Sequence, residues 1–185
     1  MSISRGQLTA LIPHPAKLPA VAVRSLSASV GALPPGRLVF EYRLEADLAR
    51  LRVPAPGAAQ RIDGLWKHTC FEAFIAVAGT TLYTELNFSP SSDWSAYAFQ
   101  DYRQGMAHAQ LPVPPQIAVR QGKNRLQLAA MVALPESEPR EVLRVGLSAV
   151  LEAEDGSLSY WATKHAPGKK PDFHHPEALI LEVTP

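Results

Sequence analysis

The chain has 185 residues, of which 46% are hydrophobic, 19% charged and 8% aromatic. This length fits one domain, since domains commonly contain ~100–150 residues. Its 18 basic and 17 acidic residues give a net charge of +1, which argues against a protein that binds nucleic acid through its phosphates. The single cysteine excludes an internal disulfide and a four-cysteine zinc site. No apolar run reaches the ~18 residues of a membrane span.

Proline is unusually frequent, with 17 residues in 185, nearly twice the usual ~5%. Since proline removes a backbone donor and interrupts helices, prolines spread along the chain divide it into short segments. Those segments show the two-residue alternation of β-strands. We therefore expect an all-β protein that forms one domain over residues 1–185. The expected architecture is a jelly-roll-like antiparallel β-sandwich of about ten strands.

The predicted strands are short alternating segments bounded by turn residues. Glycine-containing loops at 78–80, 121–123 and 155–156 each predict a hairpin. Residues 47–52 fit one helical turn before a proline-glycine break. The predicted strands cover residues 21–30, 38–45, 67–77, 81–88, 94–99, 117–120, 124–134, 143–151, 158–163 and 179–183.

Polar side chains of an unusual kind lie in the segment 65–75. A strand there would place Trp66, His68 and Glu72 on one side of the sheet, together with Cys70. A carboxylate and an imidazole beside aromatic rings need partners or water. The segment is therefore a candidate binding surface as well as a strand.

Two further segments share this character. On the strand that follows the 78–80 hairpin, Glu85 and Asn87 have one parity, so the hairpin can bring Glu85 close to Glu72. The register that decides this is not readable from the sequence. The third segment, 160–176, is a loop of mixed charge that holds three histidines. Strand ends and loops are where binding residues are usually displayed.

Together these segments resemble the bacterial DOMON-like domains, a group that is similar to the family 9 carbohydrate-binding modules. The resemblance covers residues 20–183. It implies a jelly-roll-like sandwich that binds a small ligand, a sugar or haem in characterised relatives, without catalysing a reaction. The motifs that carry it are Trp-Lys-His-Thr-Cys-Phe-Glu-Ala-Phe-Ile at 66–75, Glu-Leu-Asn-Phe-Ser-Pro-Ser at 85–91 with Trp94 and Tyr97, Tyr160 with Trp161, and Asp-Phe-His-His-Pro at 172–176.

The resemblance also implies site residues. In the sugar-binding modules an aromatic residue and a carboxylate six positions later contribute to the site, and Trp66 and Glu72 have that spacing. Glu85 stands where the resemblance leads us to expect an arginine. The second aromatic that would sandwich a sugar ring stays open between Trp94, Trp161 and Phe173. The candidate ligand-binding residues are Trp66, His68, Glu72, Glu85, Asn87, Trp94, Trp161, His165 and His174.

These residues predict one polar pocket on a sheet face, closed by Trp161 and the loop 165–175. Arg103 is a candidate partner for one of its buried carboxylates. The favoured ligand is a small molecule, and a saccharide first of all. The start of the chain, residues 1–6, lacks the apolar run of a secretory signal, so the expected location is cytoplasmic. The oligomeric state stays open.

Two alternatives accompany this interpretation. Glu72 and Glu85 could be the acid/base pair of a glycoside hydrolase, which needs two carboxylates ~5–10 Å apart. The second alternative is a protein that carries haem or a metal ion, with Met106 among the possible haem ligands. No cofactor is expected, because a buried thiol and a hydrogen-bonded histidine explain the same residues. The possible zinc ligands are His68 and Cys70, completed by His165, His174, His175 or Asp172.

Overall fold

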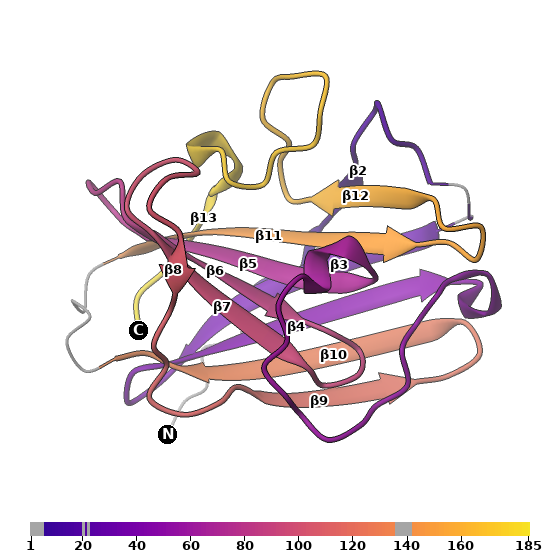
Figure 1. Ribbon diagram of the computed structural model, residues 1–185, viewed down its shortest axis with the longest axis horizontal. Helices are drawn as coiled ribbons and strands as arrows, with labels where there is room; N and C mark the ends of the chain where they lie inside the picture. The colour runs from indigo at the N-terminus through magenta and orange to yellow at the C-terminus, as the bar shows by residue number, and fades with distance from the viewer. Residues whose placement is uncertain (1–5, 20, 22, 136–141) are drawn as a thin grey trace.

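A computed structural model describes residues 6–19, 21, 23–135 and 142–185. Within them two antiparallel sheets pack face to face as a β-sandwich (Figure 1). One sheet has five strands, in the order β1 (Thr9–Ala10), β3 (Val23–Leu33), β4 (Arg37–Ala46), β10 (Arg125–Ala133) and β9 (Gln116–Gln121). Every strand pair is antiparallel, as expected.

The second sheet has eight strands and carries the site described below. Its central members β11, β5, β6 and β7 lie side by side, and β13 (Leu181–Val183) pairs with β11 beyond the end of β12. Its remaining order is β2 (Ile12–Pro13), β12 (Leu158–Ala162), β11 (Leu143–Glu152), β5 (Cys70–Val77), β6 (Tyr83–Phe88), β7 (Trp94–Phe99) and β8 (Ala107–His108).

The space between the sheets is filled by apolar side chains, which occupy alternate positions along each strand. Phe40 and Tyr42 of β4 meet Phe71 and Phe88 from β5 and β6, with ring centroids 5.7 Å apart for Phe40–Phe88 and 5.0 Å for Tyr42–Phe71. Tyr42 also donates a hydrogen bond of 2.7 Å from its hydroxyl to the main-chain carbonyl of Glu72 across the interior. This bond fixes β5 relative to the opposite sheet at the residue that matters most for the site.

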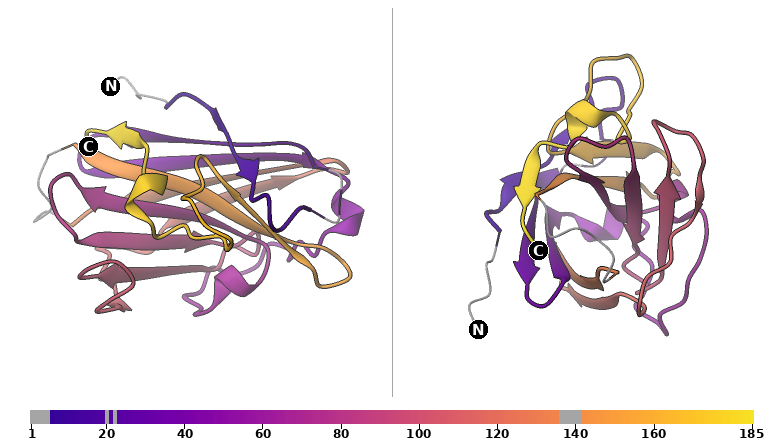
Figure 2. Two further views of the ribbon diagram at one scale, coloured as in Figure 1. Left: turned by 90° about the horizontal axis from the view of Figure 1, so that it is seen from above. Right: turned by 90° about the vertical axis from the view of Figure 1, so that its left-hand side faces the viewer.

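The outer face of the eight-stranded sheet is buried too. The chain between β12 and β13 crosses over this face (Figure 2). It contributes Phe173 to a second apolar cluster there. The members of this cluster are Phe74, Tyr83, Tyr97, Phe99, Val150, Ala162, Phe173, Ala178 and Leu179. Both faces of the sheet therefore carry buried side chains, which explains why β5, β6 and β11 have few exposed positions.

The predicted antiparallel β-sandwich is confirmed. Ten strands have three or more residues, and three further strands of two residues each, β1, β2 and β8, were not anticipated. Three short 3₁₀ turns complete the described elements: η1 (Leu48–Arg50), η2 (Leu65–Lys67) and η3 (Pro176–Ala178). The strand expected over 67–77 begins only at Cys70, since η2 ends at Lys67 and the chain bends at residues 68 and 69.

None of the helical segments in the described residues has the length and hydropathy to cross a bilayer. The expectation about a leader concerns residues 1–6, of which 1–5 lie outside the described residues.

Candidate functional site

A cavity of about 370 Å³ opens on the outer face of the eight-stranded sheet. Its floor is formed by β5, β6, β7, β11 and β12, and its walls by η2, the loop after β7 and residues 171–174. This volume lies within the ~300–1,000 Å³ that is typical of small-ligand pockets. The lining residues are Trp66, Glu72, Glu85, Tyr97, Phe99, Arg103, Met106, Val150, Tyr160, Pro171, Phe173 and His174.

The register of β5 and β6 brings the two carboxyl groups together. Glu72 lies opposite Asn87, and Glu85 lies opposite Phe74, two residues further along β5. All four side chains therefore project from the outer face, since alternate residues of paired strands share a side. Asn87 donates a hydrogen bond of 2.8 Å from Nδ2 to Oε1 of Glu85 and is itself fully buried. It supports the pair from below rather than lining the cavity.

The Glu72 carboxyl is the most unusual group in the cavity. The side chain is 3% exposed, and its Oε1 atom has no hydrogen-bond partner in the described structure. Burial raises the pKa of Glu72 well above its usual value, and the nearby charge of Glu85 raises it further. Because a neutral carboxyl tolerates burial better than a carboxylate, these effects favour a protonated Glu72 when the cavity is empty.

Glu85 is buried beside it and is better satisfied. Burial raises the pKa of Glu85, while the hydrogen bond from Asn87 and the charge of Arg103 oppose that rise. Glu72 and Glu85 titrate as a pair, because the ionisation of one raises the cost of ionising the other. The pair therefore holds a proton more readily than two separate surface carboxyls would.

His174 lies against this pair from the loop after β12. Its Nε2 atom is 3.7 Å from Oε2 of Glu85, and its Nδ1 atom is 2.9 Å from the hydroxyl of Tyr83. Burial, assisted by the charge of Arg103, lowers the pKa of His174 to about 4. The imidazole is therefore neutral at pH 7, and it contributes a polar contact to Glu85 rather than a counter-charge.

An ion pair joins the two loops at the rim. Arg103 donates a hydrogen bond of 2.8 Å from its guanidinium to Asp172, and Tyr102 donates to the same carboxylate from its hydroxyl. The main-chain N–H of Arg103 donates to Tyr83 at 3.1 Å. Arg103 adopts a positive φ of 55°, which is uncommon for a residue other than glycine. The predicted link between Arg103 and a buried carboxylate is thus indirect, since its ion-pair partner is Asp172.

Aromatic rings form the apolar wall. Trp66 is half-buried, and its ring centroid lies 5.5 Å from that of Tyr97 at an interplanar angle of 79°. Trp66 comes from η2 and not from a strand, because Gly64 turns the chain with a φ of 82° just before it. Phe99 and Tyr160 complete the wall from β7 and β12. Trp66 therefore lines the cavity from a turn, and the strand geometry that was predicted for it was wrong.

Two of the candidate aromatics face the other way. Trp94 and Trp161 pack into the core between the sheets, so the prediction that Trp161 closes the pocket was wrong. Strand alternation explains the position of Trp94. It has the same parity on β7 as Ala96, which is buried in this core, and Ala98, which packs against it. The indole N–H of Trp161 donates to the hydroxyl of Ser159 at 3.0 Å. Of the three aromatics that were left open, Phe173 lines the cavity.

Two of the candidate histidines also lie elsewhere. His68 is exposed, and its Nδ1 atom is 2.7 Å from Oε2 of Glu152 at the end of β11. His165 contacts the carbonyl of Ile12 at 2.8 Å and packs edge-on against His14 at 4.9 Å. The prediction that these two histidines share the pocket was wrong, since the segment before Cys70 is a turn and the loop carries His165 toward β2.

The placement of Cys70 and His68 does not favour the zinc alternative. The Cys70 thiol donates to Oδ1 of Asn87 at 3.6 Å on the outer face, whereas His68 is directed to Glu152. In the part of the chain that the structure describes, no three ligand-type side chains converge as a metal centre. Met106 is 59% exposed and lines the mouth of the cavity.

Some lining residues were missed by the sequence argument. Tyr97 lies opposite Glu85 in the pairing of β6 with β7, and Phe99 follows it at the same parity. Extending the alternation from two strands to a third would have found both. Val150 and Tyr160, which pair across β11 and β12, required knowledge of the strand order.

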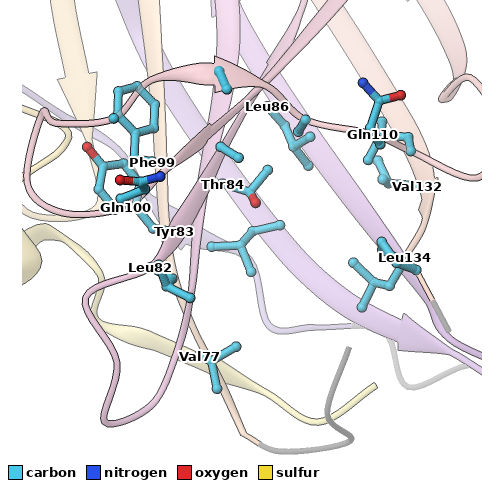
Figure 3. A pocket seen from close by; sticks show the side chains of 17 residues that line it. Val77, Leu82, Tyr83, Thr84, Leu86, Phe99, Gln100, Gln110, Val132 and Leu134 are labelled. Atoms are coloured by element: carbon cyan, nitrogen blue, oxygen red, sulfur yellow. The ribbon is translucent and has the colours of Figure 1, made fainter. Parts of the chain in front are cut away.

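A second cavity, of about 450 Å³, lies at one end of the interior between the two sheets. Figure 3 shows Leu86 and Thr84 of β6 on one side of it and Val132 and Leu134 on the other. None of the described residues that line it is charged. Among those residues it therefore has no counterpart of the carboxyl groups in the cavity on the outer face.

No family model and no curated protein matches the sequence. Solved structures do match the fold. A protein of Bacteroides uniformis that is proposed to bind carbohydrate is 12% identical with a TM-score of 0.68, the match covering 97% of this chain and 86% of that one. A family 9 carbohydrate-binding module of Caldicellulosiruptor kristjanssonii, in complex with glucose, is 10% identical with a TM-score of 0.52, covering 94% and 83%. The likeness shows a shared fold.

Proposed function

We propose that this protein is a non-catalytic saccharide-binding domain, related to the DOMON-like domains and the family 9 modules, whose site is the cavity on the outer face. One observation carries the proposal: Glu72, a buried carboxyl whose Oε1 atom has no partner, and the half-buried ring of Trp66 line the same cavity of small-ligand size. A pyranose offers the two complementary surfaces. Its C–H face packs on an aromatic ring, and its hydroxyls donate to carboxyl oxygens.

The energetics favour a ligand hydroxyl at Glu72. A buried polar atom without a partner costs roughly 1–3 kcal/mol. A ligand hydroxyl that donates to the Glu72 carboxyl would remove this cost once the carboxyl turns Oε1, which is shielded from solvent, toward the cavity. Trp66 is exposed enough to meet the sugar ring. The fold of a module crystallised with glucose supports the same ligand class.

A glycoside hydrolase is the second candidate, and one observation favours it. The raised pKa values of Glu72 and Glu85 would suit a carboxyl that acts as a general acid. Against this, the second carboxyl of a hydrolase must be ionised to activate a water or attack the sugar, whereas burial raises the pKa of Glu85 and Asn87 already donates to its Oε1 atom. We expect no turnover of chromogenic glycosides. Turnover that is lost in Glu72→Gln would favour the enzyme instead.

The test is a thermal-shift screen with a panel of mono- and disaccharides on the wild type and two variants. Trp66→Ala removes the stacking surface from a half-buried turn, so we expect a β-type spectrum and no saccharide-induced shift. His68→Ala is the matched control, because His68 lies two residues away but outside the cavity. It should keep the wild-type shift. A panel without any shift, or a Trp66→Ala variant that responds like the wild type, would contradict the proposal.

The single domain, the cytoplasmic location and the absence of a cofactor remain predictions that accompany this proposal.

A further inference from the structure

We infer that the ligand of the outer-face cavity carries a basic nitrogen, and that a protonated amino group binds between Glu72 and Glu85. The ligand class is therefore an amino sugar rather than a neutral one. This inference rests on the proposed function and narrows it.

The charges that face the cavity support this conclusion. Arg103 is the cation nearest the pair, and its guanidinium is already bonded to Asp172 on the rim. His174 is neutral at pH 7, so it supplies no charge to Glu85. The acidic side of the cavity is therefore left without a full counter-charge among the described residues. The titratable groups around it are Cys70, Glu72, Tyr83, Glu85, Tyr97, Arg103, Tyr160, Asp172 and His174.

The hydrogen bonds leave room for a donor with more than one hydrogen. Asn87 donates to Glu85, and Oε1 of Glu72 has no donor in the described structure. A neutral hydroxyl has one hydrogen to give, whereas an ammonium group has three and also a positive charge. Buried carboxylates are costly unless they are paired with a positive charge. A cation placed between two of them therefore stabilises the pair more than a neutral hydroxyl does.

The wall of the cavity fits the same group. The aromatic residues Trp66, Tyr97, Phe99 and Tyr160 line the same cavity as the two carboxyls. Aromatic faces attract cations, with contributions of ~0.5–2 kcal/mol that grow as water is excluded. An acidic sugar would instead meet two carboxyls and no free cationic side chain among the lining residues.

Binding of a cation should release a proton. Without a ligand the pair holds a proton, because burial raises the pKa of both Glu72 and Glu85 and the charge of Glu85 raises that of Glu72 further. An ammonium group favours the ionised pair, so affinity rises as the pH rises through the pKa of the pair, and it falls again where the amine loses its own proton. Neutral sugars lack this linkage, since they interact with the protonated carboxyl as well.

The experiment compares matched pairs by isothermal titration at about pH 6, where amines of this kind are protonated. The probes are glucose with glucosamine, galactose with galactosamine and mannose with mannosamine, each with its N-acetyl form. We expect at least one amine to bind about tenfold or more tighter than its neutral partner, which corresponds to ~1.4 kcal/mol. The N-acetyl form should lose this advantage, and two buffers of different ionisation enthalpy should reveal proton release.

Two variants keep the test decisive. Glu85→Gln and Glu72→Gln should each reduce the preference for the amine, and either can serve if the other does not fold. If neutral sugars bind as tightly as the amines, and Trp66→Ala abolishes their binding, the inference is overturned while the proposed function stands. If neither neutral sugars nor amino sugars bind, both the inference and the proposed function are overturned. An amine preference that survives both glutamine variants would place the cation elsewhere and also overturn the inference.

Discussion

Replacing the Glu72 carboxyl by an amide should stabilise the protein. Glu72→Gln keeps the shape of the side chain and removes its ability to ionise at a position that is 3% exposed. The new amide can also donate toward Glu85, whose like charge opposes the ionisation of Glu72 in the wild type. A buried carboxyl that lowers the stability of the folded protein is expected at a position that serves binding.

The sign of the pH dependence follows from the raised pKa of Glu72. In the unfolded chain this carboxyl loses its proton near its usual value of 4.5, and in the folded protein only at higher pH. Between the two values the unfolded state binds fewer protons, so the free energy of unfolding falls as the pH rises. Each unit of pKa difference costs ~1.4 kcal/mol. The amide has no proton to lose, so the variant escapes this fall.

We expect Glu72→Gln to raise the free energy of unfolding by about 1–3 kcal/mol near pH 8, because the folded wild type must there either bury an unpaired carboxylate or take up a proton that the unfolded chain does not bind. For a chain of this size that gain corresponds to a rise in Tm of roughly 2–12 °C. Near pH 4 the gain should vanish, because the carboxyl is protonated in both states.

Urea denaturation at several pH values, followed by circular dichroism, measures these differences. The matched control is Glu45→Gln, because Glu45 is an exposed carboxylate paired with Arg125 at 2.7 Å. It should change the free energy of unfolding by less than about 1 kcal/mol, as surface ion pairs do. A Glu72→Gln variant that is less stable at every pH, or equally more stable at pH 4 and pH 8, would refute the reasoning.

Two further predictions concern the core and the rim. Trp161→Ala should lower the free energy of unfolding, measured by urea denaturation, by about 3–5 kcal/mol, because the ring is buried between the sheets. The fraction of the variant that stays folded should still bind saccharide. A variant of wild-type stability that no longer binds saccharide would contradict the placement of Trp161 in the core. Asp172→Asn should weaken saccharide binding about threefold in titrations while changing stability by less than ~1 kcal/mol, because the ion pair with Arg103 is partly exposed, with 49% of the Arg103 side chain and 21% of the Asp172 side chain accessible. Although partial burial opposes it, bonds from Tyr102 and Arg103 lower the pKa of Asp172, so wild-type affinity should fall toward that of the variant as the pH drops through this pKa.

The strands of the site were predictable because alternation is a local property. Glu72, Glu85 and Asn87 were placed on one face by counting residues from a hairpin, and the register confirms that they share it. The same counting would have put Trp94 on the opposite face, since Trp94 pairs with Phe88 of the interior. That error arose because a resemblance of motifs was weighed above the parity of the strand.

The positions of Trp66, His68 and His165 were not predictable in this way. Trp66 reaches the cavity through a 3₁₀ turn, and His68 leaves it for Glu152 at the far end of β11. His165 is fixed by a hydrogen bond to Ile12, which is more than 150 residues away in the chain. Contacts of this range depend on strand order, and no local periodicity encodes strand order.

The chemistry of the site follows from the burial of a sheet on both sides. The chain between β12 and β13 covers the outer face with Phe173, so carboxyls that would be solvated on an ordinary sandwich surface are removed from water. An uncovered Glu72 would have its usual pKa and would compete poorly for a ligand already surrounded by solvent. Covered, it has an unmet hydrogen bond and an aromatic neighbour in Trp66. The loop that makes Glu72 costly to fold is therefore the same element that makes it able to bind.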